Sequence, residues 1–355
     1  MQSEKESGHG VIEEFRIAFA ECWQRLPNKA FFFILLGAWL VLFQWLGNAT
    51  LGYIHSQNPS LFRWMLDAYD PEGKYLRSDD GHGVFMPFVV LALFWWKRKE
   101  LLAQPLRTWP PGLAIIGLAL LLHIAGFMGQ QPKVSVIALF FGIYGLMGLA
   151  WGPAWLRTSF FPFFLFAFCV PLGQQAQFIS FPLRKLVCQL VTLVANGVLA
   201  LDVERDGTAL INASGHYQYE VAAACSGLHS LLATLALSMI YAFVSFPKWW
   251  KRLALIASAF PLAVLGNLIR MLTIIIAAEI GGQAAGNKIH DGGPGGIYSL
   301  IPYVPAFAGL LLLGHWLRER EPKKEASLEP PSRRPSPPGE GGGQQPGLAL
   351  EPGKA

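Results

Sequence analysis

Charged residues are scarce in this 355-residue chain. Asp, Glu, Lys and Arg make up 14% of it, against about a quarter in an ordinary soluble protein. Hydrophobic residues make up 53%, and the mean hydropathy is +0.37. A chain of this length with so little charge does not have the surface of a soluble protein. The composition therefore predicts a polytopic membrane protein, an all-α bundle of transmembrane helices.

Cysteine is also scarce, and its spacing excludes two classes of site. The four cysteines are Cys22, Cys169, Cys188 and Cys225. They lack the spacing of metal ligands, and three of them lie in or beside apolar runs, where a free thiol packs as a small hydrophobe. We therefore expect no zinc site, no disulfide framework and no cofactor. The net charge of +5 is modest and comes in short clusters beside apolar runs, which favours membrane-flanking charge over nucleic-acid binding.

The two ends of the chain lack long apolar runs. The first thirty residues carry several glutamates before the apolar run that begins at Ala30, so we expect no cleavable signal peptide. Residues 1–30 are predicted to be a cytoplasmic N-terminal segment. Residues 318–355 are rich in Pro and Gly and have almost nothing to bury, which predicts a disordered cytoplasmic tail. The transmembrane domain is then 31–317.

Eight apolar stretches approach the length of about 20 residues that a helix needs to cross a bilayer. Two of them are weak, because one is short and the other is interrupted by Pro162 and Pro171. Residues 186–201 are apolar as well, but the polar residues among them favour a helix at the outer interface over a ninth crossing. The expected spans are 31–52, 84–96, 112–129, 134–151, 159–173, 228–246, 253–280 and 297–317.

The basic loops predict the orientation of these spans. Lys and Arg gather in 97–107, at Arg157, in 247–252 and after the last span. All four lie on the same side if there are eight spans, and cytoplasmic loops carry the excess of basic residues. Both termini are then cytoplasmic. The remaining long loops then face away from the cytoplasm.

Three reactive side chains should converge on that outer side. Cys225 precedes the outer end of the span 228–246, and the next span, 253–280, returns outward and carries Arg270 about two thirds of the way along. His290 follows in a glycine-rich outer loop. A thiol near a helix N-terminus has a lowered pKa, and an arginine in a membrane helix usually serves a function. The alternatives are a cysteine that packs, an arginine that reaches the headgroups and a solvated histidine.

Neighbouring residues support the same site. Ser226 suits a helix N-cap, and Gly227 lets another backbone approach closely. Asn267 lies three residues before Arg270 on the same helical face and could orient its guanidinium. Asp291 is a weaker candidate. His229 lies four residues after Cys225 on the same face, so the choice of catalytic base between His229 and His290 stays open.

A short hairpin is predicted before Cys225. Residues 208–221 contain β-prone runs around Ser214 and Gly215. The hairpin could bind an extended peptide by strand addition, or it could be a structural cap over the helix ends.

The chain resembles the exosortases, polytopic bacterial enzymes related to the archaeosortases. The motifs that carry the resemblance are "VAAACSGLHSL", "GNLIR" and "KIHDGGPGG", in this order, with "DDGHGVFMPFVVLALFWWKRKEL" further upstream. The resemblance covers roughly Gly81 to Leu313. It implies that Cys225 is the nucleophile, with Arg270 and His290 as catalytic partners. Many members have Arg where this chain has His229.

The resemblance implies a cysteine protease or transpeptidase of the bacterial inner membrane with its active site on the extracytoplasmic side. Its expected substrates are exported proteins whose C-terminal signal is a Pro-Glu-Pro type motif, a membrane helix and a basic tail. The acyl acceptor, water or an amine, and the oligomeric state are not determined by the sequence. A transporter, or a non-catalytic membrane component of polysaccharide or protein export, is the alternative from the residues alone.

Overall fold

The computed structural model describes the backbone of residues 2–48, 58–70, 80–220, 228–293, 297–298 and 300–318. The chain divides into a compact unit, Met1–His315, and a C-terminal segment, Trp316–Ala355. All elements below belong to the first unit, apart from the end of the last helix.

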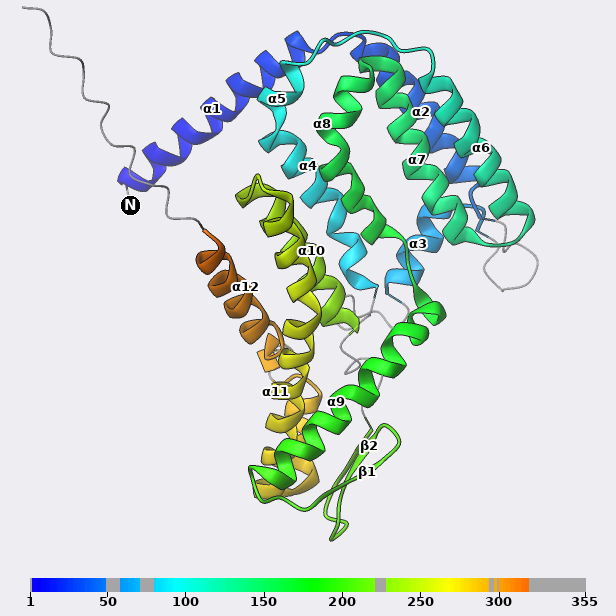
Figure 1. Cartoon of the computed structure of the whole chain (residues 1–355). Helices are drawn as coiled ribbons and strands as arrows, with labels where there is room; N and C mark the ends of the chain where they lie inside the picture. The colour runs from blue at the N-terminus through cyan, green and yellow to red at the C-terminus, as the bar shows by residue number, and fades with distance from the viewer. Residues whose placement is uncertain are drawn as a thin grey trace, which may run out of the picture. The chain divides into compact units, whose positions relative to one another are not determined.

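The first half of this unit is a bundle of apolar helices (Figure 1). α7 is its most buried long helix, because glycines at three-residue spacing let its neighbours approach closely. The ring of Trp39 lies against Gly142, and the side chain of Leu156 lies against Gly148. The elements of this half are α1 (Gln2–Arg25), α2 (Lys29–Leu46), α3 (Leu61–Tyr69), η2 (Gly81–Val84), α4 (Met86–Trp96), α5 (Arg98–Leu102), α6 (Gly112–Met128), α7 (Pro132–Trp151), α8 (Pro153–Phe164) and η3 (Leu165–Cys169).

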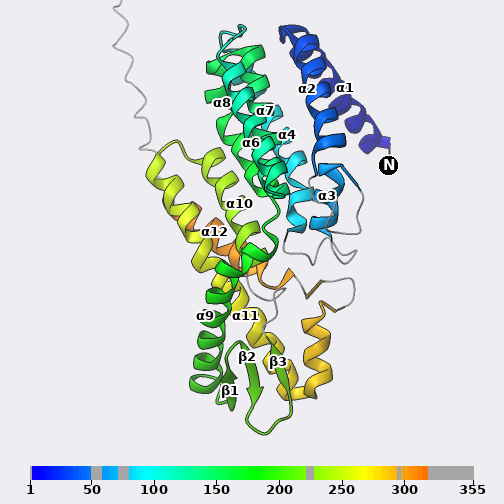
Figure 2. The same ribbon diagram turned by 90° about the vertical axis from the view of Figure 1, so that its right-hand side faces the viewer.

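The second half contains a small sheet and a helical hairpin. α9, the sheet and the C-terminal part of α11 gather at one end of the unit, away from the junction of α7 and α8 (Figure 2). They share a hydrophobic core that includes Val187, Leu210, Tyr219 and Ile274. The elements are η4 (Gly173–Ala176), α9 (Gln177–Gly197), β1 (Val203–Asp206), β2 (Ala209–Asn212), β3 (Gln218–Glu220), α10 (Leu228–Ser245), α11 (Trp249–His290) and α12 (Tyr303–Leu317).

The sheet is antiparallel with the strand order β1-β2-β3. Asp206 pairs with Ala209, so a two-residue turn joins β1 to β2, and Gly207 takes the positive φ of 60° that this turn requires. Leu210 pairs with Tyr219. The predicted hairpin is therefore present, and β1 extends it to three strands.

α11 reverses direction near its C-terminal end. Gly282 has φ 71° and ψ −177°, a conformation that favours glycine, and it separates a long first segment from a short second one that ends at His290. Figure 2 shows the second segment beside β3. We expected 281–296 to be a loop, and this was wrong for the residues up to His290. The glycines of this segment produce a reversal between two helices.

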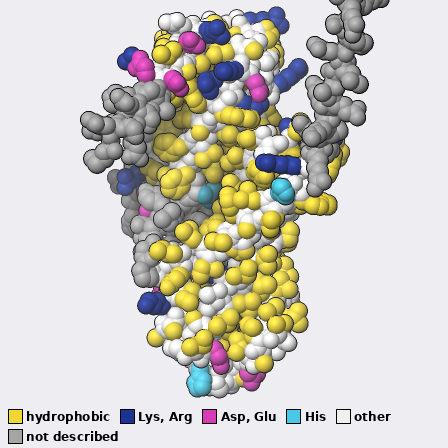
Figure 3. Space-filling model, turned by 90° about the vertical axis from the view of Figure 1, so that its left-hand side faces the viewer, with side chains coloured by type: hydrophobic (Ala, Val, Ile, Leu, Met, Phe, Trp, Pro, Cys, Tyr) yellow, Lys and Arg dark blue, Asp and Glu magenta, His cyan; other side chains and the backbone are white. Residues whose placement is uncertain are grey.

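The loop after α5 and the junction of α7 and α8 lie at one end of the bundle, and the turn between α10 and α11 lies at the level of α4 (Figure 1). Lys97 Nζ donates to the carbonyl of Thr158 at 3.3 Å, and the amide of Trp109 donates to the carbonyl of Leu149 at 3.0 Å. These bonds join the residue after α4 to α8, and the loop before α6 to the last turn of α7. On the face in Figure 3, most Lys and Arg side chains gather near this end, and hydrophobic side chains cover much of the rest.

Every expected span corresponds to an apolar helix. By length and composition, α2, α7, α9 and α11 are able to cross a membrane, and α4, α6, α8 with η3, α10 and α12 are shorter apolar helices. The all-α fold class is confirmed. α9 starts at Gln177, nine residues before the stretch assigned to the interface, and it packs against α11 and the sheet.

Candidate active site

Arg270 and His290 meet where α11 folds back on itself. Arg270 lies about 32 Å along α11 from Trp249, at a rise of about 1.5 Å per residue, which is close to the thickness of a bilayer core. Its side chain is buried, with 9% of its surface exposed. Nη2 donates to the backbone carbonyl of His290 at 3.3 Å. The reversal at Gly282 therefore brings together two residues that are twenty positions apart.

The guanidinium of Arg270 keeps one donor unused. Its Nε is buried and has no hydrogen-bond partner within the described part of the chain. A buried N–H without an acceptor is unfavourable, because it has lost its bond to water. A group with a developing negative charge at this position would satisfy it.

Asn267 joins α11 to the first turns of α10. Its Nδ2 donates to Ser230 Oγ at 2.7 Å and to the carbonyl of Ala263 at 2.9 Å, and the side chain is 2% exposed. We expected Asn267 to orient Arg270. The hydrogen bonds of its amide instead fix the start of α10 beside the helical turn of α11 that precedes Arg270. Ser230 was not among the predicted residues.

His290 is oriented by the residue that follows it. His290 Nδ1 lies 3.2 Å from Asp291 Oδ1. An ionised carboxylate only accepts hydrogen bonds, so Nδ1 carries the hydrogen and Nε2 carries the lone pair. Asp291 is mostly exposed, and the ring of Tyr219 lies 6.1 Å from the His290 ring, centroid to centroid.

Tyr219 supports this arrangement, and sequence analysis missed its role. Its hydroxyl donates to the carbonyl of Gln283 at 3.0 Å, and its ring packs so closely on Gly286 that a Cβ there would overlap it. Burial, and then the charge of Asp291, raise the pKa of Tyr219, so the hydroxyl remains a donor at neutral pH. The alternation of Tyr217 and Tyr219 with polar residues was the sequence signal for an inward-facing position.

The proposed nucleophile lies outside the described residues, as do Ser226 and Gly227. Cys225 precedes Ser230 by five residues, a length of chain that spans at most about 18 Å. His229 belongs to α10, but its side chain is not among those described. The described histidine that lies next to Arg270 is thus His290.

The other cysteines and acidic residues do not form a second centre in the described ranges. Cys22, Cys169 and Cys188 are free, and the last two are buried. Among the described residues, no group of three or more His, Cys, Asp or Glu side chains is close enough to hold a metal ion.

The comparisons with known proteins identify the family. The family model described as transmembrane exosortase matches residues 75–314, which is more than half of the chain. No curated protein and no solved structure matches the chain significantly. The match spans all the motifs that resemble exosortases, from the Asp80 turn to His290. The chain therefore belongs to the transmembrane exosortase family and is a multi-pass membrane protein.

Proposed function

We propose that this protein is a membrane-embedded cysteine protease or transpeptidase that cleaves the C-terminal sorting signal of exported proteins. The contact between Arg270 and His290 carries the proposal. It lies beside the start of α10, which the Ser230–Asn267 bond holds against α11. Cys225 precedes Ser230 by five residues along the chain. A thiol, a guanidinium and an imidazole are therefore available within one region.

Each residue has a chemical role in this proposal. His290 Nε2 takes the proton of the Cys225 thiol, and the thiolate attacks the scissile carbonyl. The new C–S bond gives a tetrahedral oxyanion that the guanidinium of Arg270 stabilises. When the C–N bond breaks, His290 Nε2 gives a proton to the leaving amine, and a thioester remains. His290 then takes a proton from the acceptor, water or an amine, which attacks the thioester and releases the thiolate.

The proposal includes a substrate class, which membership of the family supports. The expected substrates are exported proteins that end in a Pro-Glu-Pro type motif, an apolar helix and a basic tail. The substrate helix would lie in the bilayer against the protein, with its basic tail on the same side as the basic loops. The active site then faces outward from the bacterial inner membrane, at the opposite end of the α10–α11 hairpin from Lys248.

Replacement of the nucleophile tests this proposal. The Cys225→Ala variant should lose all processing of a reporter that ends in such a motif, helix and basic tail, because no other thiol is placed to form the thioester. Processing is measured as the change in reporter mass in membranes that contain equal amounts of each variant. Cys169→Ala is the matched control and should process the reporter, since this thiol is buried in another cluster. Processing by Cys225→Ala at the wild-type rate would refute the proposal.

A further inference from the structure

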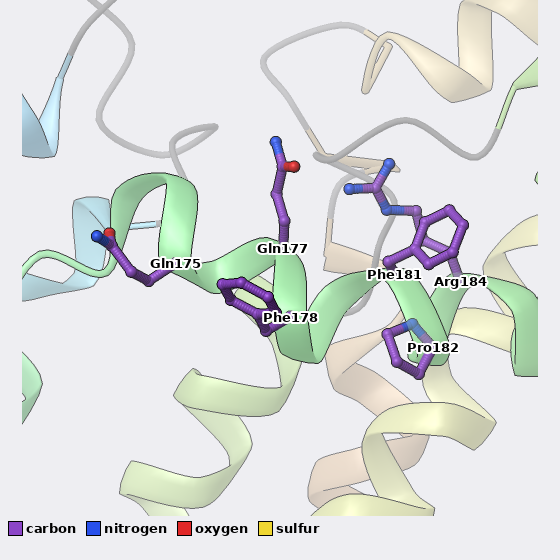
Figure 4. A pocket seen from close by; sticks show the side chains of 6 residues that line it. All are labelled: Gln175, Gln177, Phe178, Phe181, Pro182 and Arg184. Carbon is purple, nitrogen blue, oxygen red and sulfur yellow. The ribbon is translucent and has the colours of Figure 1, made fainter.

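A second polar site lies on α9, a helix that packs against α11. An open pocket of about 700 Å³ follows the first two turns of α9 (Figure 4). Neither the sequence motifs nor the proposed catalytic steps use any residue that lines it. The lining residues are Gln175, Gln177, Phe178, Phe181, Pro182 and Arg184.

Arg184 is only partly satisfied by its neighbours. Its Nη2 donates to Ser180 Oγ at 3.3 Å, and its Nε is buried without a hydrogen-bond partner in the described part of the chain. Gln177 precedes Arg184 by seven residues, so both lie on one face of the helix. Their side chains extend to the same side of α9 in Figure 4. The pocket therefore presents an amide and a guanidinium, whose Nε is covered by protein.

The remaining contacts hold this part of the chain in place. The buried carboxylate of Asp80 accepts hydrogen bonds from the backbone amides of Leu172 and Gly173, each at 2.9 Å. Lys133 Nζ donates to Oε1 of Gln175, the first residue of the pocket. The buried carboxylate of Asp80 therefore fixes the backbone that leads into the pocket.

α9 packs against both helices of the candidate active site. Leu183, next to Arg184, belongs to the hydrophobic cluster that contains Met271, and Leu231 packs against this cluster. Met271 follows Arg270, and Leu231 follows the serine that binds Asn267. The pocket therefore lies on a helix that adjoins the helices of the candidate active site.

The side chains of the pocket match one class of ligand. The two Nη atoms of a guanidinium bind a carboxylate in a forked geometry, which a lysine does not reproduce. Glutamine amides bind peptide backbone, and this protein contains an example. The Gln283 side chain accepts the amide of Gln218 at 2.9 Å and donates to its carbonyl at 3.1 Å. Phe178 and Pro182 supply apolar walls.

We propose that the α9 pocket binds an acidic side chain of the extended substrate segment next to the scissile bond, with Arg184 as the residue that selects it. This inference rests on the proposed function. Arg184 binds the carboxylate, and Gln177 binds the adjoining backbone. The pocket determines which segment is cleaved and takes no part in the chemical steps.

Matched reporters test the role of Arg184. One reporter carries Glu in the motif before its helix, and the other carries Gln at the same position. The wild-type protein should process the Glu reporter with a kcat/KM about tenfold or more above that of the Gln reporter, since a bond between charged groups contributes this much. Arg184→Gln should remove this preference by lowering kcat/KM for the Glu reporter alone. Lys185→Gln removes the same charge one position along and should keep the preference.

Charge reversal provides the decisive measurement. Arg184→Glu should process a reporter with Lys in place of the motif Glu better than it processes the Glu reporter. Equal processing of the Glu and Gln reporters by the wild-type protein would overturn the inference. An equal loss on both reporters in Arg184→Gln would also overturn it, because a structural or lipid-binding role predicts that result. Cys225→Ala should process none of the reporters, so failure of the pocket is distinguishable from failure of the proposed function.

Discussion

Arg270 places a permanent charge among apolar neighbours within the first segment of α11, twelve residues before Gly282. A charge at the centre of a membrane helix costs about 2.5 to 3.5 kcal/mol on insertion scales. One of its donors binds the carbonyl of His290 and another remains unpaired in the described part of the chain. An arginine that only stabilised the fold would be expected to use its buried donors within the protein. The unpaired Nε is therefore the feature that distinguishes a binding role from a structural one.

The two histidines can be separated by one pair of substitutions. We expect His290→Ala to lower kcat for reporter processing by at least about a hundredfold, the usual contribution of a general acid–base. We expect His229→Arg to process the reporter at close to the wild-type rate, since many exosortases carry Arg there. The measurement is kcat at saturating reporter. The kcat of Asp291→Asn should lie between those of the two histidine variants, because asparagine still accepts a hydrogen bond from Nδ1 but lacks the charge of the carboxylate.

Solubility and helix content of each variant serve as the control for folding. The role of base passes to His229 if His290→Ala retains activity and His229→Arg loses it. Loss of activity in both variants would mean that the two imidazoles act together, in conflict with the assignment of a single base.

At the level of elements, α10 and α11 show which features the sequence was able to predict. Their boundaries and antiparallel course followed from two apolar runs around a basic turn. The sequence did not predict the reversal at Gly282. The glycines in "IGGQAAGNKIH" indicate that a helix breaks there, but they do not indicate that a second helical segment comes next. The second segment is helical and packs against Tyr219 through Gly286. That contact joins distant parts of the chain and is not visible in local sequence.

The close approach of α11 to the chain before α12 gives a prediction for this element. A Cβ on Gly266 would overlap the backbone carbonyl of Pro302, which cannot move away as a flexible side chain does. Gly266→Ala should therefore destabilise the protein by about 1–3 kcal/mol, the cost of overpacking a core. It should also displace the neighbouring Asn267 and slow reporter processing. Thermal unfolding in detergent measures the loss of stability.

Gly37→Ala is the matched control for this substitution. Gly37 lies in α2, and a Cβ there would meet nothing within 4 Å. The control should be neutral or slightly stabilising, because alanine favours helix over glycine by about 1 kcal/mol. An unfolding temperature of Gly266→Ala equal to that of the control would show that α11 and Pro302 are not in contact.

At the level of the whole molecule, composition and basic loops predicted more of the fold than the motifs did. The apolar helices and the gathering of basic loops at one end followed from the bilayer and from charge alone. The packing of α9 against α11 did not, since an apolar run of its length fits either a span or a helix that packs on protein. The Arg184 pocket was missed for the same reason. Only tertiary packing places Arg184 beside the helices that carry Ser230 and Arg270.

The orientation of the molecule yields the last prediction. The basic loop at Lys99 and the sheet at Asp206 lie at opposite ends of the unit, and both side chains are exposed. A bilayer with the cytoplasm at the basic end therefore leaves the sheet outside. In a protein whose four native cysteines are replaced, a cysteine at position 206 should react with a membrane-impermeant maleimide on intact cells. A cysteine at position 99 should react only after the membrane is permeabilised. Labelling of both positions from outside, or of position 99 alone, would invert the orientation. It would also place Arg270 and His290 where no exported substrate arrives.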